Sequence, residues 1–255
     1  MSLKKEIISA KVKYKEIAIF WLGQAGFLIK DSKNTCVVID PYLTDCGERM
    51  KGFKRLSPKL ISPDELPSDI YISTHIHFDH FDYDAIPIVA KHTQTNFYGP
   101  KSSVEEFEKI GINKDRIKLL ELGKTVEEKD IKIKPIYADH GSLAPDAIGL
   151  LLDIDGIKLY FSGDTAYRPE RLDEVIKFNP DIAVLSINGK FGNLNADEGA
   201  KVVEKVKPKI AIPAHFWTFK EHNGNPQLFE EKVIEYYPKT KVEFMAQGES
   251  LKYSK

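Results

Sequence analysis

An α/β fold is the class that this sequence predicts, because strand-like and helix-like segments alternate along its length. Short apolar runs rich in branched residues are interspersed with capped segments whose apolar residues recur at helical spacing. Several of the apolar runs also end in a histidine or an aspartate. No repeat, low-complexity tract or long Pro/Gly/Ser linker interrupts the 255 residues, so we expect one domain over residues 1–255.

Strands are predicted where four to eight apolar residues run together or alternate with polar ones. Most of these runs contain isoleucine, valine or aromatic residues, which pack well on a pleated sheet. The predicted strands cover residues 17–22, 27–30, 36–39, 70–74, 131–138, 148–154, 157–162, 182–187 and 210–213.

Three helices are predicted from their start signals and apolar stripes. Pro169 opens the first, Asn195 caps the second with Glu198 three residues on, as in a capping box, and Asn225-Pro226 begins the third. The residues expected on the buried faces are Leu172, Val175 and Ile176, then Ala196, Ala200, Val203 and Val206, then Phe229, Val233 and Tyr236.

The composition is that of an ordinary soluble globular protein, with 42% hydrophobic and 29% charged residues. Lys and Arg number 37 against 38 for Asp and Glu, so the net charge of -1 gives no general attraction to nucleic acid or anionic membranes. No segment resembles a signal peptide or a membrane span, so we expect a cytoplasmic protein. Cys36 and Cys46 are expected to be reduced thiols.

The segment Thr74 to His80 is the strongest chemical signal in the chain. Three of the seven histidines, His75, His77 and His80, fall within six residues and are joined there by Asp79. Imidazole nitrogen and carboxylate oxygen are the ligands that hold zinc and its neighbours in the first transition row. The alternation of His75 and His77 directs two rings to one face, while Asp79 and His80 can reach a second ion. The alternative is a polar surface loop with incidental histidines.

Three further strand candidates end in residues that bind metals, His140, Asp164 and His215. Sites in layered α/β folds form at the carboxyl ends of strands. Taken singly, His140 and His215 are explained equally well as hydrogen-bonded loop residues or as ligands, and Asp164 is explained better as part of a turn. Together with the first segment, they favour a metal site.

The order of these motifs resembles the metallo-β-lactamase superfamily. The resemblance rests on Asp40 after a strand, His75-x-His77-x-Asp79-His80, His140, Asp164 and His215, and it extends from about Trp21 to Gly248. It implies a four-layer αβ/βα sandwich with two metal ions. The implied ligands are His75, His77 and His140 on one ion, Asp79, His80 and His215 on the other, and Asp164 between them, with Asp40 as a buried carboxylate that organises the site loops.

Further strings resemble the branch that contains L-ascorbate-6-phosphate lactonases. They are Trp21-Leu22-Gly23-Gln24-Ala25-Gly26-Phe27, Asp40-Pro41-Tyr42-Leu43, Ser162-Gly163-Asp164-Thr165, Ile187-Asn188-Gly189 with Gly192-Asn193-Leu194-Asn195, and Pro213-Ala214-His215-Phe216-Trp217. Two features depart from this branch: Gln24 stands where many relatives carry histidine, and the chain is shorter than the characterised lactonases. Asp164 at the bridging position argues against a β-lactamase, and the length leaves no room for the extra domain of nuclease members.

The resemblance predicts a hydrolase in which a hydroxide shared by two divalent ions (zinc, manganese or iron) attacks a small lactone, such as a phosphorylated sugar lactone. Asp79 and Asp164 are the expected catalytic carboxylates. The alternatives are a phosphodiesterase of the same fold and a non-catalytic metal-binding protein. A small molecule is the expected partner, without nucleic acid or membrane, and homo-oligomerisation stays open. Candidate substrate contacts, each also explained as a solvated loop residue, are Arg168, Asn188, Lys190, Asn193 and His222.

Overall fold

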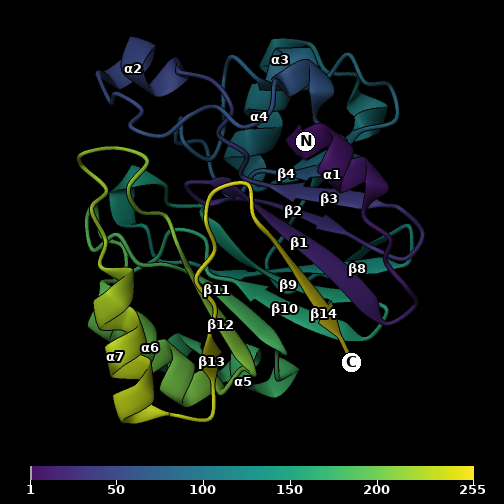
Figure 1. Ribbon diagram of the computed structural model, residues 1–255. Helices are drawn as coiled ribbons and strands as arrows, with labels where there is room; N and C mark the ends of the chain where they lie inside the picture. The colour runs from purple at the N-terminus through teal and green to yellow at the C-terminus, as the bar shows by residue number, and fades with distance from the viewer. Residues whose placement is uncertain (1) are drawn as a thin grey trace. The chain divides into compact units, whose positions relative to one another are not determined.

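The computed structural model describes residues 2–255, which form two compact units (Figure 1). The first unit contains residues 2–121 together with residues 245–255, and the second is Leu122–Phe244. The chain therefore leaves the first unit after residue 121 and returns to it at residue 245.

The first unit is built on a mixed sheet in the order β14-β1-β2-β3-β4-β5-β6. The strands are β1 (Glu16–Gly23), β2 (Gly26–Lys30), β3 (Cys36–Ile39), β4 (Ile70–Ile72), β5 (Asn96–Gly99), β6 (Ile117–Leu119) and β14 (Ser250–Ser254). Strands β14, β1, β2 and β3 pair antiparallel, and β3 to β6 pair in parallel. Strand β4 lies inside the parallel part, so its carboxyl end opens onto an edge that also receives the ends of β3 and β5.

Helices pack on this sheet and enclose the core of the first unit. The helices are α1 (Leu3–Ser9), α2 (Cys46–Lys51), α3 (Ile86–Val89) and α4 (Lys101–Ile110), with short 3-10 turns at Pro63–Glu65 and Lys114–Arg116. Figure 1 shows α1, α3 and α4 on the same side of the sheet. Ile7, Val89 and Phe107 from these helices are fully buried in one cluster with strand residues such as Phe20 and Phe97. Burial of this apolar surface is the main stabilising term of the unit.

The second unit has its own mixed sheet, in the order β13-β12-β11-β10-β9-β8-β7. The elements are β7 (Val126–Glu128), β8 (Ile131–Tyr137), β9 (Ile148–Ile154), β10 (Ile157–Phe161), α5 (Asp173–Phe178), β11 (Ile182–Ser186), α6 (Ala196–Val206), β12 (Ile210–Ala214), α7 (Pro226–Tyr236) and β13 (Lys241–Val242), with 3-10 turns at Gly141–Leu143 and Pro169–Arg171. Strands β7 to β10 pair antiparallel and β10 to β13 pair in parallel. Each unit thus joins an antiparallel portion to a parallel portion.

The predicted α/β fold class is confirmed, with helices accompanying both mixed sheets. All nine predicted strands are present within one or two residues of their expected ends. The capping box at Asn195 is present, and the predicted stripe of α6 is buried. The helix expected from Pro169 begins as a 3-10 turn, and α5 starts only at Asp173. Ile176 was assigned to the buried face wrongly, because it is 41% exposed while Val175 is buried.

Among residues 2–255, no helix is both long enough and apolar enough to cross a membrane. The two cysteines, Cys36 and Cys46, are free thiols, as predicted, and both are buried.

Candidate metal centre

The histidine-rich segment of the first unit forms a tight turn directly after β4. The amide of His80 and the amide of Phe81 both donate to the carbonyl oxygen of His77, at 2.9 and 2.7 Å, which curls the segment. As a result, Nε2 of His75 lies 2.9 Å from Nδ1 of His77, and the rings of His75 and His80 are 4.1 Å apart. His75 and His80 are fully buried and His77 is half-buried. The turn therefore gathers three imidazoles in a space with little water.

Both carboxylate oxygens of Asp40 hold this turn in place. Oδ1 accepts the backbone amide of Thr74 at 2.7 Å, and Oδ2 accepts the hydroxyl of Thr74 at 2.6 Å. Oδ2 also lies 2.7 Å from Nδ1 of His80, which leaves Nε2 of His80 as the nitrogen for a metal ion. The side chain of Asp40 is buried and its backbone has a positive φ of 45°. Asp40 thus orients the ring of His80, a predicted ligand.

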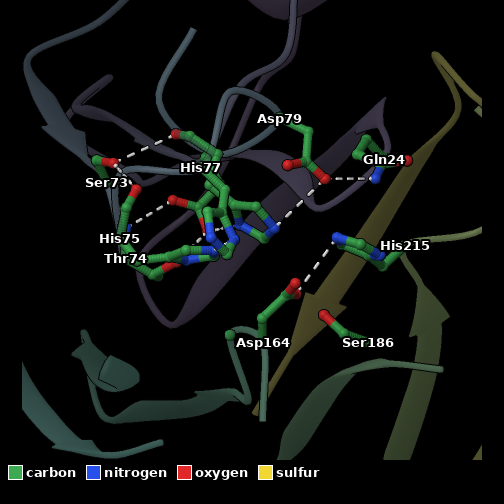
Figure 2. Close-up of polar contacts among 12 residues, drawn as sticks. Gln24, Ser73, Thr74, His75, His77, Asp79, Asp164, Ser186 and His215 are labelled. Atoms are coloured by element: carbon green, nitrogen blue, oxygen red, sulfur yellow. Dashed lines mark hydrogen bonds and ion pairs between the residues drawn. The ribbon is translucent and has the colours of Figure 1, made fainter. Parts of the chain in front are cut away.

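Asp79 is held by Gln24, which lies in the turn between β1 and β2. Nε2 of Gln24 donates to Oδ2 of Asp79 at 2.8 Å, and both side chains are buried (Figure 2). The indole nitrogen of Trp21 donates to the carbonyl oxygen of Gln24 at 2.9 Å, which fixes the turn. Oδ2 of Asp79 is also 3.7 Å from Nε2 of His80. The contact of Gln24 with Asp79 was not foreseen, because 55 residues separate the two in sequence.

The second unit brings its three predicted ligands together at the carboxyl ends of its strands. His140 follows β8, Asp164 follows β10, and His215 follows β12 directly, with a φ of 66°. Oδ1 of Asp164 lies 3.3 Å from Nε2 of His215, and Oδ2 lies 3.8 Å from Nε2 of His140. Figure 2 shows Asp164 and His215 directed toward each other. All three side chains are buried, so the two oxygens of one carboxylate serve two different imidazoles.

The loop from residue 188 to residue 194 closes over Asp164 within the same unit. Nδ2 of Asn193 donates to Oδ2 of Asp164 at 2.7 Å, and the amide of Leu194 donates to the carbonyl of Thr165 at 3.0 Å. Asn188 is buried at the start of this loop, two residues after β11 ends. Asn193 therefore contacts a predicted metal ligand directly, in addition to any role toward a substrate.

His222 lies against the predicted ligand His215 in an aromatic cluster. The two rings are stacked, with centroids 4.8 Å apart and an angle of 22° between their planes. Phe191 and Phe219 contact the ring of His222 at 5.4 and 5.3 Å. His222 is only 5% exposed, so it supports the ring of His215.

The two cationic candidates of the second unit are placed differently. Nε of Arg168 forms an ion pair with Oδ2 of Asp139 at 2.5 Å, and this hydrogen bond holds the pKa of the Asp139 carboxyl below its usual range. Lys190 is exposed. The guanidinium charge of Arg168 is thus largely matched by a carboxylate of its own unit.

The chemistry and the spacing of these donors suit divalent metal ions. The predicted ligands are neutral imidazoles and carboxylates without a cysteine, the set that zinc, manganese and iron accept. Two nitrogens bonded to one tetrahedral zinc at about 2.0 Å lie about 3.3 Å apart, and the 2.9 Å between His75 and His77 is close to that separation. Burial removes the hydration of the Asp79 and Asp164 carboxylates, and a bound cation would offset that cost. The residues present therefore fit a metal centre.

Comparisons with known proteins define the class to which this fold and these donors belong. Residues 18–215 match the model of the β-lactamase superfamily domain, which includes the parts of both units that carry the donors. A UPF0173 metal-dependent hydrolase of Methanosarcina mazei is 30% identical over 254 residues, covering 92% of this chain and 98% of that protein. A second such hydrolase, from Thermoplasma volcanium, is 33% identical over 222 residues, covering 84% of this chain and 90% of that protein.

A solved metallo hydrolase of Ignicoccus hospitalis has the same fold, with a TM-score of 0.72 and 21% identity, and the match covers 94% of this chain and 99% of that one. The chain therefore belongs to the β-lactamase superfamily and, within it, to the UPF0173 family of metal-dependent hydrolases.

Proposed function

We propose that this protein is a hydrolase that depends on two divalent metal ions and acts on a small lactone. The seven proposed ligands are His75, His77, Asp79, His80, His140, Asp164 and His215, and we propose that the donor sets of both units serve the same pair of ions. The names of the related proteins support metal-dependent hydrolysis. The proposed partner is accordingly a small molecule, without nucleic acid or membrane.

The arrangement of Asp164 is the observation that carries the proposal. Its two oxygens lie near two different imidazoles, those of His215 at 3.3 Å and His140 at 3.8 Å. A carboxylate between two histidines suits two cations better than one, because each oxygen can bind a different ion. Asn193 holds Oδ2 at 2.7 Å and so limits rotation of the carboxylate.

When bound, the ions lower the pKa of a shared water and polarise the carbonyl group, so no side chain is needed as the primary base. The side chains of the protein orient the reacting groups and transfer the proton. Asp79 is held by Gln24 at 2.8 Å, which keeps its carboxylate in one orientation. We propose that the Asp79 carboxylate accepts the proton that the attacking water gives up and passes it to the departing ring oxygen. The water oxygen bonds to the carbonyl carbon, the ring C–O bond breaks, and a hydroxy acid is released.

The preference for a lactone over a phosphodiester follows from the resemblance to lactonases described above. Recognition of phosphate groups typically requires available guanidinium or ammonium donors. Arg168 already forms an ion pair with Asp139 at 2.5 Å. The lactonases that the chain resembles act on phosphorylated sugar lactones, so Lys190 and Arg168 are both worth testing for a phosphate contact. Lys190 is exposed, and the ion pair of Arg168 with Asp139 is weak because it is exposed.

A substrate panel run separately with zinc, manganese and iron tests this function. It contains a hydroxylated lactone, its phosphorylated analogue, an activated phosphodiester and an activated ester. We expect about two ions per chain and turnover of the lactones. Asp164→Asn should retain the fold by circular dichroism, bind fewer ions and lose activity by orders of magnitude.

Each alternative outcome has its own meaning. Preferential turnover of the phosphodiester would replace the lactonase with the phosphodiesterase. Two ions without turnover of any compound would favour a metal-binding protein, and at most one ion after reconstitution would exclude the dinuclear centre. Equal effects of Arg168→Ala on phosphorylated and unphosphorylated lactones would remove phosphate recognition from the proposal.

A further inference from the structure

The side chain of Asn188 is a buried amide that the fold leaves unused. Asn188 is 3% exposed, and neither Oδ1 nor Nδ2 has a hydrogen-bond partner within residues 2–255. A buried polar group without a partner is destabilising, so most such groups are paired. An amide with both of its atoms unpaired therefore needs an explanation in what it binds.

The position of Asn188 is fixed although its side chain is unpaired. The amide of Gly189 donates to the carbonyl of Leu194 at 2.8 Å, which closes the loop after Asn188. On the other side, Gly224 packs so tightly that a Cβ there would lie 3.0 Å from Cα of Asn188 and 2.6 Å from the carbonyl oxygen of Ile187. The indole nitrogen of Trp217 donates to the carbonyl of Gly224 at 3.0 Å and holds it in place. Asn188 is thus held rigidly, as a binding group should be.

The backbone of Asn188 also follows a strand that pairs with the strand leading to the proposed ligand His215. Ser186 pairs with Ala214 across β11 and β12, and the amide of Ile187 donates to the carbonyl of Ala214 at 3.1 Å. Asn188 and His215 are therefore the residues that follow this last pairing on two adjacent strands. The same loop returns to Asp164 through Asn193, whose Oδ1 also has no hydrogen-bond partner in the described chain.

We propose that Asn188 is a substrate-binding residue that recognises a carbonyl group with a hydrogen-bond donor next to it. Nδ2 donates to the carbonyl oxygen of the substrate, and Oδ1 accepts from an adjacent hydroxyl or N–H. The amide is neutral and offers one donor and one acceptor side by side, so it suits a hydroxylated lactone better than a plain alkyl lactone. This inference rests on the hydrolase function proposed above and names the substrate class of that site.

Two substitutions at Asn188 test the proposal. Asn188→Leu keeps the branched skeleton and removes both polar atoms, and Asn188→Ala is a smaller second variant. Because no internal hydrogen bond is lost, we expect the melting temperature of at least one of them to equal or exceed that of the wild type. For the metal-loaded enzyme, kcat/KM for the hydroxylated lactone should fall by about 10-fold or more, with a smaller fall for the alkyl lactone.

Asn195→Ala is the control, because Asn195 belongs to the same loop region but its side-chain oxygen already accepts a hydrogen bond within the chain. Its side chain accepts the amide of Glu198 and forms the capping box of α6. This variant should melt at a lower temperature than the wild type, because the cap of α6 is lost, while its kcat/KM ratio between the two lactones stays unchanged.

A binding measurement separates this inference from the hydrolase function. The probe is δ-valerolactam, whose carbonyl and N–H match the amide of Asn188 and which the enzyme is not expected to cleave. Saturation-transfer NMR on metal-depleted protein should show binding by wild type and by Asn195→Ala, and at least 10-fold weaker binding by Asn188→Leu. Equal binding by all variants, no binding by wild type, or equal destabilisation at Asn188 and Asn195 would overturn the proposal. Absence of turnover in the wild type would instead overturn the hydrolase function.

Discussion

Asp40 and Asp79, two buried carboxylates of the first unit, are held in different ways. Asp40 accepts hydrogen bonds from the backbone amide and the hydroxyl of Thr74, and it contacts Nδ1 of His80. It therefore stabilises the turn that carries the histidines. Oδ2 of Asp79 accepts a hydrogen bond from the side-chain amide of Gln24. A neutral amide fixes the direction of the carboxylate without cancelling its charge, and the charge remains available to a metal ion or a proton.

Gln24→Met should weaken metal binding while leaving the fold intact. Methionine has nearly the same length but cannot donate to Asp79, so the carboxylate gains rotational freedom. Loss of such a supporting hydrogen bond typically lowers metal affinity by about 10- to 100-fold, which competition with a chromogenic chelator would measure. Gln227→Met is the control, because Gln227 is an exposed glutamine that bonds to Glu231 on α7. Unchanged affinity in Gln24→Met would mean that Asp79 needs no support from Gln24.

The thiol of Cys46 gives a prediction about pH. Burial, followed by the nearby charge of Asp82, raises the pKa of Cys46 from 9.0 to about 12. Because the folded state keeps the proton longer than the unfolded state, the stabilising contribution is complete below pH 9 and is lost as pH rises from 9 to about 12. Over this window, Cys46→Ala should reduce the fall in unfolding free energy by at most about 1.4 kcal/mol per pH unit. Urea titrations at pH 8, 9.5 and 10.5 would measure the difference, and parallel curves for both proteins would refute it.

The helices and strands differ in how well they can be predicted from the sequence. Strand β11 is apolar and buried at every position, and α6 combines a capping box with a buried stripe, so both were predicted. Strand β14 alternates between exposed and half-buried residues at an edge, and α1 has only two buried residues and no side-chain cap, so neither was predicted. Such elements depend on tertiary pairing more than on local propensity.

The candidate site shows the same division. The proposed metal ligands were predicted because their residue types and their positions after strands are visible in the sequence. The contacts of Gln24 with Asp79 and of Asn193 with Asp164 join residues 55 and 29 positions apart. Amides carry no metal-binding signature, so only the folded chain reveals such partners.

Lys30 at the end of β2 anchors α1 and gives a prediction at the scale of this element. Its ammonium group is buried and donates to the carbonyls of Ile7, Ile8 and Ala10, each at 2.9 Å. Lys30→Met keeps the apolar stem but removes all three hydrogen bonds at the carboxyl end of α1. We expect a loss of about 1–3 kcal/mol and faster hydrogen exchange confined to residues 3–10. Slow exchange there, as in the wild type, would show that apolar packing alone holds α1.

At the scale of the molecule, each unit supplies part of the proposed ligand set. His75, His77, Asp79 and His80 belong to the first unit, and His140, Asp164 and His215 belong to the second. If the ions are common to both sets, their binding energy must stabilise both units, since a ligand stabilises whatever must be folded to bind it.

Metal should therefore protect the first unit only when the ligands of the second are intact. At free metal 100-fold above the dissociation constant, we expect about 2.7 kcal/mol of added stability for the wild type. Hydrogen exchange in residues 74–81 should slow when metal is added to the wild type. It should slow much less in the double variant that combines His140→Ala and His215→Ala. Equal slowing in both proteins would mean that the first unit binds its ions alone.

The pairing of β14 with β1 also bears on how the chain is made. Glu16 pairs with Ser254, so the sheet of the first unit is completed by residues that are synthesised after the whole of the second unit. While the intervening Leu122–Phe244 is being synthesised, one edge of β1 has no neighbouring strand. An open edge invites association with other nascent chains. The second unit is contiguous in sequence and can fold during that interval. The risk of aggregation during synthesis is therefore greatest for the first unit, most of which is synthesised earlier.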